Sequence, residues 1–258
     1  MTQPFIDFII PSFNDSRILR AVRSITAHRE SAKFKILIQD GGSDDRLLEL
    51  LQALLRPQDQ VFQERDRGVF DALNKALEKV TAPWVGWIGS DDLLASTFDP
   101  ASLAHAPSDC ALVSWATAFF DEPSMRVTRL FVPVASPWLR KQGAHLPHFS
   151  TFVRREAARS ERFQADQKNF ADQAYFLALE RRYRVQVRRQ ISTYMAAGGV
   201  SNASAKGILE TNLTVAKALR GEKGRVGATI FVLVKLVYKL VQVMAARRNP
   251  TSVPRSLW

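Results

Sequence analysis

The chain has 258 residues, of which 46% are hydrophobic and 24% are charged. These values fit one large soluble domain, or one domain with an appendage. A single cysteine, Cys110, excludes an internal disulfide framework and a cysteine-rich zinc site, and it fits a reducing cytosol. The first residues run directly into a strand-like segment and do not have the pattern of a secretory signal.

Residues 5–90 alternate between short apolar runs and amphipathic segments. The apolar runs predict strands at 5–10, 34–38, 61–62 and 84–88. The amphipathic segments predict helices from a cap at Asn14 or Asp15 to about residue 28, at 47–55, and at 69–80. Alternating strands and helices indicate an α/β fold with a mixed, mainly parallel sheet flanked by helices.

The second half of the chain has a different pattern. Apolar runs at 111–120 and 126–132 predict an antiparallel pair, and further strands are expected at 148–153, 185–187 and 191–195. Residues 133–147 contain prolines and show no periodicity, which suits a loop that covers a substrate. A helix is expected at 171–181 with Asp172 in its first turn, and residues 198–201 are expected to form a small-residue loop.

The tail predicts two helices, at 205–219 and from 226 to about 247, joined by a turn at 221–224. The second helix is very apolar except for a stripe formed by Lys235, Lys239 and Gln242. A helix of this length, about 30 Å, could span a bilayer, but each lysine would cost about 2.5–3.5 kcal/mol at the centre. We therefore favour a helix that lies in the membrane surface with its lysines toward phosphate head groups. Packing on the domain or on a partner, and spanning, stay open.

The formal net charge of +11 is uneven, because from Lys206 onwards only Glu210 and Glu222 are acidic. A basic tail fits an anionic membrane surface. Nucleic acid is not an expected partner, since the tail has no basic motif interleaved with aromatic residues. The alternative is a solvated basic face without a partner.

Polar residues follow the predicted parallel strands, at 11–15, at 40–43, at Arg67 and at Asp91–Asp92. Ligands of such sheets bind outside the carboxyl ends of the strands, so these segments are expected to meet in one crevice. Asp91 and Asp92 repel each other, and each resists desolvation at the end of a buried strand. A divalent cation or a sugar hydroxyl relieves both costs, which predicts metal-assisted chemistry on an oxygen-rich substrate.

These motifs, in this order, resemble a known family. The chain is similar, over roughly residues 5–203, to family 2 glycosyltransferases with the GT-A fold, and most of all to bacterial transferases of the colanic-acid and O-antigen type. The motifs that carry the resemblance are Ile9-Ile10-Pro11-Ser12-Phe13-Asn14, Asp40-Gly41-Gly42-Ser43, Asp66-Arg67-Gly68-Val69-Phe70-Asp71-Ala72-Leu73-Asn74-Lys75, Ser90-Asp91-Asp92, His148-Phe149-Ser150, Ala171-Asp172 and Gly199-Val200-Ser201.

The resemblance implies a role for each matching position. Contacts with the nucleotide-sugar are implied for one group of residues: Pro11, Phe13 beside the base, Asp40 on the base N–H, Arg67 near the diphosphate, Asn74 and Asp91. Asp91 and Asp92 match the acids that bind the metal, Mg²⁺ or Mn²⁺, and the ribose. Asp172 matches the general base of an inverting transfer, and further contacts with the diphosphate or the acceptor are expected from His148 and Ser201.

The chain departs from the family pattern at three positions. Gly89 stands where an Asp or Asn often precedes the acidic pair, which predicts a lower metal affinity. Ala174 stands where a second acid usually follows the base, and Phe149 stands where Gln is frequent after the histidine. Acceptor recognition is therefore left open.

Local structure offers simpler explanations for most of these residues. Asp40 could only form a turn, Asp91 could cap a helix, and Arg67 could pair with Glu64 or Asp71. Asn74 could bond to a neighbouring loop, while Asp172 could be a helix N-terminal acid without a catalytic role. His148 could be a core histidine, and 198–199 could be a plain turn.

The resulting interpretation is an inverting transferase that moves a sugar from a nucleotide-diphosphate donor to a glycan or a lipid-linked acceptor in bacterial cell-surface polysaccharide synthesis. Residues 1–204 are expected to form the GT-A domain and 205–258 a helical tail. The protein is expected to be cytoplasmic and peripheral at the inner face of the cell membrane. The alternative is a catalytically weak nucleotide-sugar-binding or scaffold protein with the same fold. Because no GxGxxG or P-loop follows the first strand, dehydrogenases and nucleotidyltransferases are disfavoured.

Overall fold

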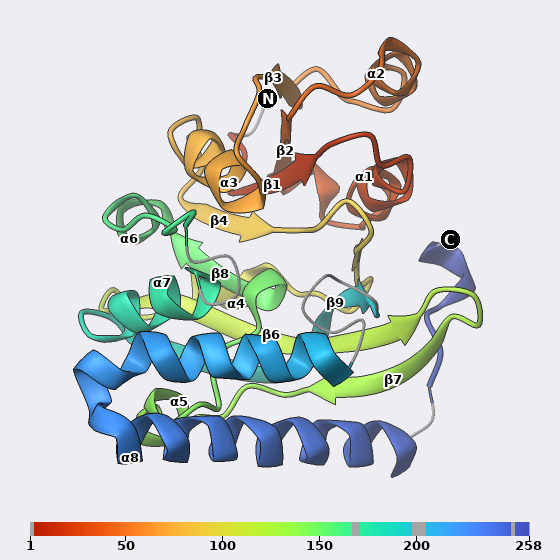
Figure 1. Ribbon diagram of the computed structural model, residues 1–258. Coiled ribbons are helices and arrows are strands. Elements are labelled where there is room, and N and C mark those ends of the chain that lie inside the picture. Colours follow the sequence, from red (N-terminus) through yellow and green to blue (C-terminus); the bar gives the residue numbers. More distant parts are fainter. Residues whose placement is uncertain (1–2, 167–170, 198–204, 249–250, 258) are drawn as a thin grey trace.

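The computed structural model describes residues 3–166, 171–197, 205–248 and 251–257 (Figure 1). Its first half is the predicted parallel sheet. Four strands pair in parallel in the order β3–β2–β1–β4, and they are β1 (Ile6–Ser12), β2 (Phe34–Asp40), β3 (Gln60–Gln63) and β4 (Trp84–Trp87). Helices α1 (Ile18–Thr26), α2 (Asp45–Gln52) and α3 (Val69–Leu77) connect them. The expected alternation is confirmed.

The second half extends the same sheet with mixed directions. β8 (Thr151–Arg154) runs antiparallel to β4 and to β6 (Cys110–Asp121), and β7 (Arg126–Phe131) is the predicted antiparallel partner of β6. β9 (Arg184–Ala196) runs parallel to β6 and carries the short β5 (Leu93–Leu94), which the sequence interpretation missed.

One strand replaces the two that were predicted at 185–187 and 191–195. Val187 pairs with Ser114 and Ile191 pairs with Ala116, so residues 188–190 form an irregularity where β9 shifts its register on β6. The polar run Arg188-Arg189-Gln190 interrupts the apolar pattern but not the strand. A bulge of this kind inserts residues without ending the pairing.

The remaining helices are short, and their bounds are α4 (Ala101–Ala104), α5 (Pro137–Lys141), α6 (Arg155–Arg159), α7 (Ala171–Glu180), η1 (Ser31–Lys33), η2 (His148–Ser150) and η3 (Arg255–Leu257). α5 lies within the segment expected to be irregular. Ser136 caps it by accepting from the Leu139 N–H at 3.3 Å, and Pro137 begins it, a helix start that was overlooked. The strand predicted from 148 begins as η2 and becomes extended only at Thr151.

The start of α1 is also different from the prediction. Arg17 precedes α1 and makes no side-chain cap, whereas Asn14 adopts a left-handed backbone with φ 48°. Asp15 accepts from Arg17 and from the Ser90 hydroxyl instead of capping the helix. The two polar residues therefore shape the end of β1 rather than the helix.

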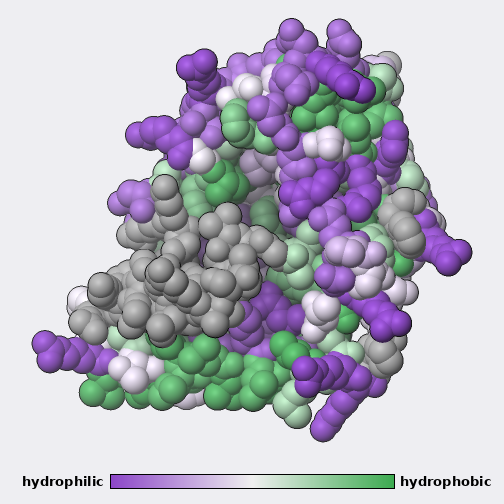
Figure 2. Space-filling view, turned by 45° about the vertical axis from the view of Figure 1, so that its right-hand side comes forward, coloured by the Kyte–Doolittle hydropathy of each residue, from purple (hydrophilic) through white to green (hydrophobic). Residues whose placement is uncertain are grey.

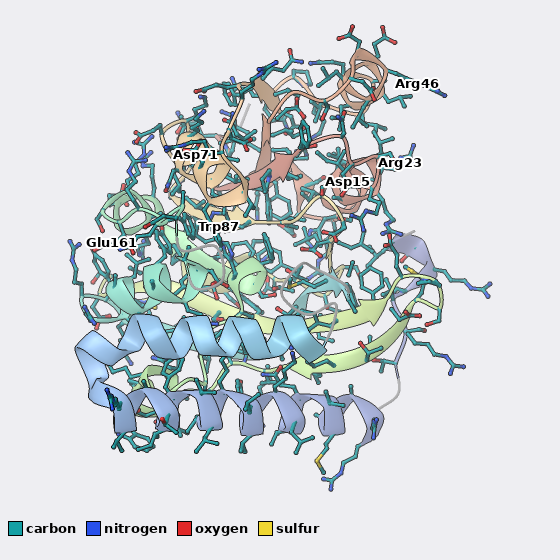
Figure 3. The ribbon with its side chains drawn as sticks, viewed as in Figure 1. Asp15, Arg23, Arg46, Asp71, Trp87 and Glu161 are labelled. Carbon is teal, nitrogen blue, oxygen red and sulfur yellow. The ribbon has the colours of Figure 1, made fainter. Side chains whose placement is uncertain are left out.

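Two apolar layers cover the sheet. Ile6, Phe8 and Ile10 of β1 point to the face that α1 covers, and Ile9 points to the face that α3 and α7 cover. This alternation follows from the period of two in a strand. Trp87 lies on β4 between α3 and α7, with its ring near Tyr175 and Phe176 (Figure 3). Trp84 and Trp87 are both core residues, as predicted.

The tail forms α8 (Ala205–Arg248), which is broken at Gly224, where φ is 69° and ψ is 175°. This break corresponds to the predicted turn between two helices. The part after Gly224 lies along β7 at the lower edge of the molecule (Figure 1). The segment after α8 then returns to β7, where the Val253 N–H donates to the Met125 carbonyl at 2.9 Å.

The polar stripe of α8 faces the domain, so the prediction that it faces lipid head groups is wrong. Gln242 is 4% exposed, Lys235 is half-buried, and the Tyr238 hydroxyl donates to the Val132 carbonyl of the loop after β7. Apolar residues occupy the outer face instead, with Leu233, Val237 and Leu240 all more than half exposed. By length and composition, Gly224–Arg248 could also cross a membrane. In the folded chain the stripe is turned toward the domain, where the adjacent Tyr238 is also bound.

A buried ion pair fixes α5 against the end of α7, and its removal gives a test of the fold. Arg140 Nε lies 2.6 Å from Glu180 Oε2, both side chains are 3% exposed, and Arg140 also donates to the Val134 and Ala135 carbonyls. We expect Glu180→Ala to lower the free energy of unfolding by about 3–5 kcal/mol, since it leaves a buried guanidinium without an anion. Denaturant unfolding measures this loss.

The matched control is Glu156→Ala, which removes the partner of Arg155 from a more exposed pair. That loss should stay within about 1 kcal/mol. The double variant Arg140→Met/Glu180→Leu should recover much of the stability. Equal losses for Glu180→Ala and Glu156→Ala would contradict the proposed structural role of the pair.

Candidate active site

A cavity of about 550 Å³ lies at the carboxyl ends of the parallel strands. Segments that follow β1, β2, β3 and β4 line it, as the sequence pattern predicted, and the loop before β8 and the end of β9 complete it. The lining residues are Pro11, Ser12, Phe13, Gly41, Asp66, Gly68, Val69, Ala72, Gly89, Ser90, Asp91, Asp92, Phe149, Met195 and Ala196. Pro11, Phe13, Asp91 and Asp92 were predicted site residues.

Phe13 presents an aromatic ring at this cavity, with 65% of the residue exposed. The loop that carries it is tied to the loop after β2. The Asn14 N–H donates to Ser43 Oγ at 2.8 Å, and Asn14 Oδ1 accepts from the Asp44 N–H at 2.9 Å. An exposed aromatic ring on a fixed loop is suited to stacking on a flat ring of a ligand.

The acidic pair at the end of β4 is divided between two environments. Asp92 is 2% exposed, and its carboxylate accepts from the Ala196 N–H at 3.0 Å and from the Gly89 N–H at 3.2 Å. Burial, and then the charge of Asp91, raise the pKa of Asp92 well above its ordinary value. Burial also raises the pKa of Asp91, which the Arg17 guanidinium opposes. A cation in this cavity would relieve the repulsion.

The pair fits a divalent cation that shares its coordination with a ligand. Mg²⁺ is usually held by one or two carboxylates together with substrate phosphates and water. Within the described ranges, no group of three or more His, Cys, Asp or Glu side chains is placed to hold a metal ion by itself. Asp91 and Asp92 would therefore supply only part of the coordination shell.

Gly89 makes room for both carboxylates. A Cβ atom at this position would lie 2.7 Å from Asp92 Oδ2, closer than real Cβ contacts, and 3.1 Å from Asp91 Oδ1, which is tighter than most of them. The glycine that replaces the acid frequent in the family thus lets the pair fold back toward the strand. The space that a side chain would fill is used by the two carboxylates themselves.

Arg17 is a residue of this region that sequence reasoning missed. Its guanidinium lies 3.4 Å from Asp91 Oδ2, 2.8 Å from Asp15 Oδ2 and 3.1 Å from Glu122 Oε2. Glu122 comes from the turn between β6 and β7, so only the fold reveals this network. The contact keeps one positive charge beside the acidic pair.

Asp40 does not line the cavity. The residue is fully buried, and its carboxylate accepts from the Gly42 N–H at 3.0 Å, the Ser43 N–H at 2.8 Å and the Ser43 hydroxyl. In this structure it shapes the turn after β2. Beside Gly41, the carboxylate at the cavity is that of Asp66, whose Oδ2 would be 2.8 Å from a Cβ atom at Gly41. Asp66 stood in a quoted motif but was assigned no role.

Arg67 and Asn74 lie at a second cavity, of about 450 Å³, with Asp71 and Phe163. The Arg67 side chain is 84% exposed and lies 3.4 Å from Asp71 Oδ1, one of the pairings that the sequence allowed. Asn74 donates to the Phe163 carbonyl at 2.8 Å and accepts from the Phe163 N–H at 2.9 Å. Asn74 is thus engaged with the segment after α6, and neither residue lines the main cavity.

His148 lies behind the main cavity. Its ring stacks on Phe149, which lines the cavity, with 4.6 Å between ring centroids, and it contacts Trp87, Phe163 and Phe176. Burial lowers the pKa of His148 to about 4, and the nearby charge of Asp172 opposes this shift. His148 is therefore neutral near pH 7.

Asp172 lies in the first turn of α7, as predicted, and is half-buried. It does not line the cavity described above, but it lies within electrostatic range of His148. His148 in turn stacks on Phe149, which lines the cavity. Ser201 lies outside the described residues. The structure brings Pro11, Phe13, Asp91 and Asp92 together at the cavity and places His148 behind Phe149 in its wall.

A mixed sheet flanked by helices, with paired acids at the carboxyl edge of its parallel half, is the GT-A fold. Residues 7–181 match Glycosyl transferase family 2, and the chain belongs to this family. Its fold resembles TarS of S. aureus, with a TM-score of 0.59 and 14% identity over 90% of this chain and 42% of TarS. It also resembles the mannosyltransferase PcManGT from Pyrobaculum calidifontis in complex with GDP-Man and Mn²⁺, with a TM-score of 0.59 and 16% identity over 97% and 77%.

The sequence is also similar to a curated mycobacterial protein. A PGL/p-HBAD biosynthesis glycosyltransferase of Mycobacterium bovis (strain BCG / Pasteur 1173P2) is 30% identical over 117 residues. The match covers 42% of this chain and 46% of the relative, so it spans about half the length of that protein. The family and the fold are thereby established.

The buried histidine leads to a prediction about acid stability. The folded pKa of His148 is about 4, below its ordinary value near 6.5, so the unfolded chain binds the proton first as the pH falls. The contribution of His148 to stability is full above about pH 6.5 and is lost progressively toward pH 4. We expect His148→Phe to lose less stability than the wild type over this window, which denaturant unfolding at several pH values measures. Equal pH slopes for both proteins would contradict the burial argument.

Proposed function

We propose that this protein transfers a sugar from a nucleotide-diphosphate donor to a glycan or lipid-linked acceptor, with inversion at the anomeric carbon. One observation carries the proposal: an exposed aromatic ring, Phe13, and the acidic pair Asp91–Asp92 line the same cavity at the carboxyl ends of the strands. Membership of glycosyl transferase family 2 supports the reaction class. A structural neighbour in complex with UDP-GlcNAc supports a nucleotide-sugar as the donor.

The donor would lie with its base near Phe13 and its diphosphate near Asp91. Phe13 offers a face for stacking, and Asp66 offers a carboxylate next to Gly41 that can accept a hydrogen bond from a base N–H. We therefore assign to Asp66 the base contact that the sequence interpretation gave to Asp40. In this arrangement Asp40 holds the turn that brings Gly41 to the cavity.

Asp91 and Asp92 would hold a divalent cation, which when bound offsets the negative charge that develops on the leaving diphosphate. Two structural neighbours were solved with Mn²⁺, which supports a divalent cation in this fold. The raised pKa values of both acids agree with this role, because each carboxylate is more easily ionised when a cation is close. Asp91 is the more accessible of the two acids.

Asp172 would act as the general base. It would take the proton from the attacking hydroxyl of the acceptor, on the side opposite the leaving diphosphate. Attack from that side inverts the anomeric configuration, as in glycosidases that use one carboxylate as base. His148, which is neutral, would line the path between this acid and the cavity.

Asp172→Asn tests this assignment. Purified protein is mixed with UDP-sugars and GDP-sugars, Mn²⁺ and alkyl glycosides as simple acceptors, and release of the nucleoside diphosphate is measured. We expect the variant to lose about 10²–10⁴-fold in kcat, the contribution of a general base, while binding nucleotide diphosphate normally. Binding is measured by the increase in melting temperature with UDP or GDP and Mn²⁺.

Three outcomes separate the alternatives. Transfer at the normal rate by Asp172→Asn would show that another group is the base. Binding of nucleotide-sugar by the wild type without turnover on any acceptor would favour the alternative, a nucleotide-sugar-binding or scaffold protein with the same fold. A melting temperature that does not respond to nucleotide with Mn²⁺ would contradict the proposed donor site.

We also propose that residues 205–258 attach the domain formed by residues 1–204 to an anionic membrane surface on the cytoplasmic side, where a lipid-linked acceptor for polysaccharide synthesis would be found. Support comes from the outer face of α8, whose apolar residues form the hydrophobic band along the lower edge in Figure 2. Exposed Arg225, Arg247 and Arg248 flank this face. Trp138 of α5 is 65% exposed on the segment that precedes the contact with α8 and would suit the lipid–water interface.

Vesicle binding tests this attachment. We expect the wild type to sediment with vesicles that contain phosphatidylglycerol, and Val237→Glu/Leu240→Glu to bind at least tenfold more weakly, because each apolar side chain contributes about 1.5–3 kcal/mol when buried. Leu50→Glu, at an exposed position on α2, is the matched control and should bind like the wild type. Equal binding of the two variants would rule out α8 as the contact surface.

A further inference from the structure

Arg17 places a positive charge beside the acidic pair without lining the cavity itself. Its Nη1 lies 3.4 Å from Asp91 Oδ2, and Asp91 together with Ser90 forms the adjacent wall of the cavity. The guanidinium is therefore next to the place where the proposed divalent cation would meet Asp91. A cation bound there would be repelled by the guanidinium, because two positive charges that contact one carboxylate lie close together.

The contact with Asp91 is the longest of the three that hold this guanidinium. Asp15 binds it with both carboxylate oxygens, since Nε donates to Oδ1 and Nη2 donates to Oδ2, each at 2.8 Å. Nη1 also donates to Glu122 Oε2 at 3.1 Å. A carboxylate that accepts two parallel N–H groups is the strong form of a charged hydrogen bond. Asp91 can therefore leave the guanidinium while Asp15 and Glu122 keep it in place.

Both anchors of the guanidinium are themselves fixed. Asp15, which is labelled in Figure 3, accepts from the Ser90 hydroxyl at 2.7 Å, so the loop after β1 is tied to the loop after β4. Glu122 lies in the turn between β6 and β7 and also accepts from Arg20 Nη2 at 2.7 Å. The positive charge is therefore a permanent part of this site.

A diphosphate would remove the obstacle that the guanidinium creates. Mg²⁺ is usually held by one or two carboxylates together with substrate phosphates. The negative charge of a diphosphate offsets the guanidinium as well as the metal, so a divalent cation meets less repulsion when the donor is present. Two ligands that assist each other in this way do so to the same extent in both directions.

We propose that Arg17 is a positioning residue of the metal site, which holds Asp91 when no cation is bound and makes cation binding depend on the nucleotide diphosphate. Asp91 leaves Arg17 for the cation, and the diphosphate supplies the charge that makes this exchange favourable. The inference rests on the proposed role of Asp91 and Asp92 as cation ligands. It predicts that removal of Arg17 strengthens metal binding, a result that damage to the fold would not produce.

The binding test uses Arg17→Met, which keeps an unbranched side chain and removes its charge. Free Mn²⁺ is measured by electron paramagnetic resonance during titration of the protein, first alone and then with UDP or GDP, with a correction for the Mn²⁺ that the nucleotide binds by itself. We expect the variant to bind Mn²⁺ alone about tenfold more tightly than the wild type, a change within the range of coupling between contacting charges. The factor by which nucleotide tightens Mn²⁺ binding should fall by a similar amount.

Arg20→Met is the matched control. Arg20 lies about one turn further along α1, and its ion pair is with Glu122 rather than with Asp91. The control thus removes the same charge and a partner of the same acid. We expect its affinity for Mn²⁺ to stay within about twofold of the wild type, because charges that do not contact the site are screened. Equal gains in Arg17→Met and Arg20→Met would show that net charge alone governs Mn²⁺ binding and would overturn the inference.

A double-mutant cycle tests the ion pair without metal or turnover. Melting temperatures are measured in EDTA for the wild type, Arg17→Met, Asp91→Asn and the double variant. We expect Asp91→Asn to raise the melting temperature more in the Arg17→Met protein than in the wild type, because Asp91 there lies beside Asp92 without its counter-ion. Additive effects would contradict the proposed role of Arg17.

The outcomes separate this inference from the proposed function. Unchanged or weaker binding of Mn²⁺ by Arg17→Met would overturn the inference whether or not the protein transfers sugar. Tighter binding by Arg17→Met, together with a wild type that shows no turnover on any donor, would support the inference and overturn the proposed function. Failure of the wild type and of Arg17→Met to bind Mn²⁺, with or without nucleotide, would overturn the proposed metal site and the inference with it.

Discussion

The burial of one carboxylate links the two halves of this sheet. Asp92 follows a parallel strand, β4, and accepts from the Ala196 N–H at the end of β9, which belongs to the second half. An ionised carboxylate in such a place resists desolvation, and the adjacent Asp91 adds repulsion. The same contacts set Asp92 into the wall of the cavity, where the proposed cation would offset this cost. The arrangement would therefore be most favourable with the site filled.

The neighbours of the two acids give them different tasks. Backbone N–H groups hold Asp92 in a fixed position, whereas a side chain, Arg17, meets Asp91. Arg17 is itself held by Asp15 and by Glu122, so the charge beside Asp91 depends on the turn between β6 and β7. A carboxylate held by flexible side chains can change partners when a cation or diphosphate arrives, while one held by backbone cannot. Asp91 is thus suited to exchange its ion-pair partner for a ligand, whereas the carboxylate of Asp92 keeps a fixed orientation.

The sequence predicted the parallel half well, because a buried strand reads as an apolar run and its polar successors must lie at one edge. The meeting of Asp91 and Asp92 with the segment after β1 was predicted this way, whereas Phe13 was singled out by the family resemblance. Three kinds of information were missing. A side-chain cap looks the same in sequence whether it serves a helix or a loop, as Asp15 shows. A carboxylate in a glycine-rich turn can face the ligand or the turn, and only coordinates reveal that Asp66 lies in the cavity and Asp40 does not. Contacts between distant segments, such as Asn74 with Phe163 or Arg17 with Glu122, leave no local pattern.

The last helix shows that a hydrophobic pattern determines which residues share a helix face but not which face turns toward the domain. The stripe formed by Lys235, Lys239 and Gln242 was visible, and lipid head groups were the cheapest partner for an isolated helix. In the folded chain the stripe is turned toward the domain instead: Lys235 lies against the segment at Gly143, and the neighbouring Tyr238 donates to the Val132 carbonyl. Once the polar stripe is turned inward, the apolar residues must face outward, and a contiguous exposed apolar surface is typical of an interaction site. The polar interior contact and the apolar outer face are therefore two consequences of one choice of helix orientation.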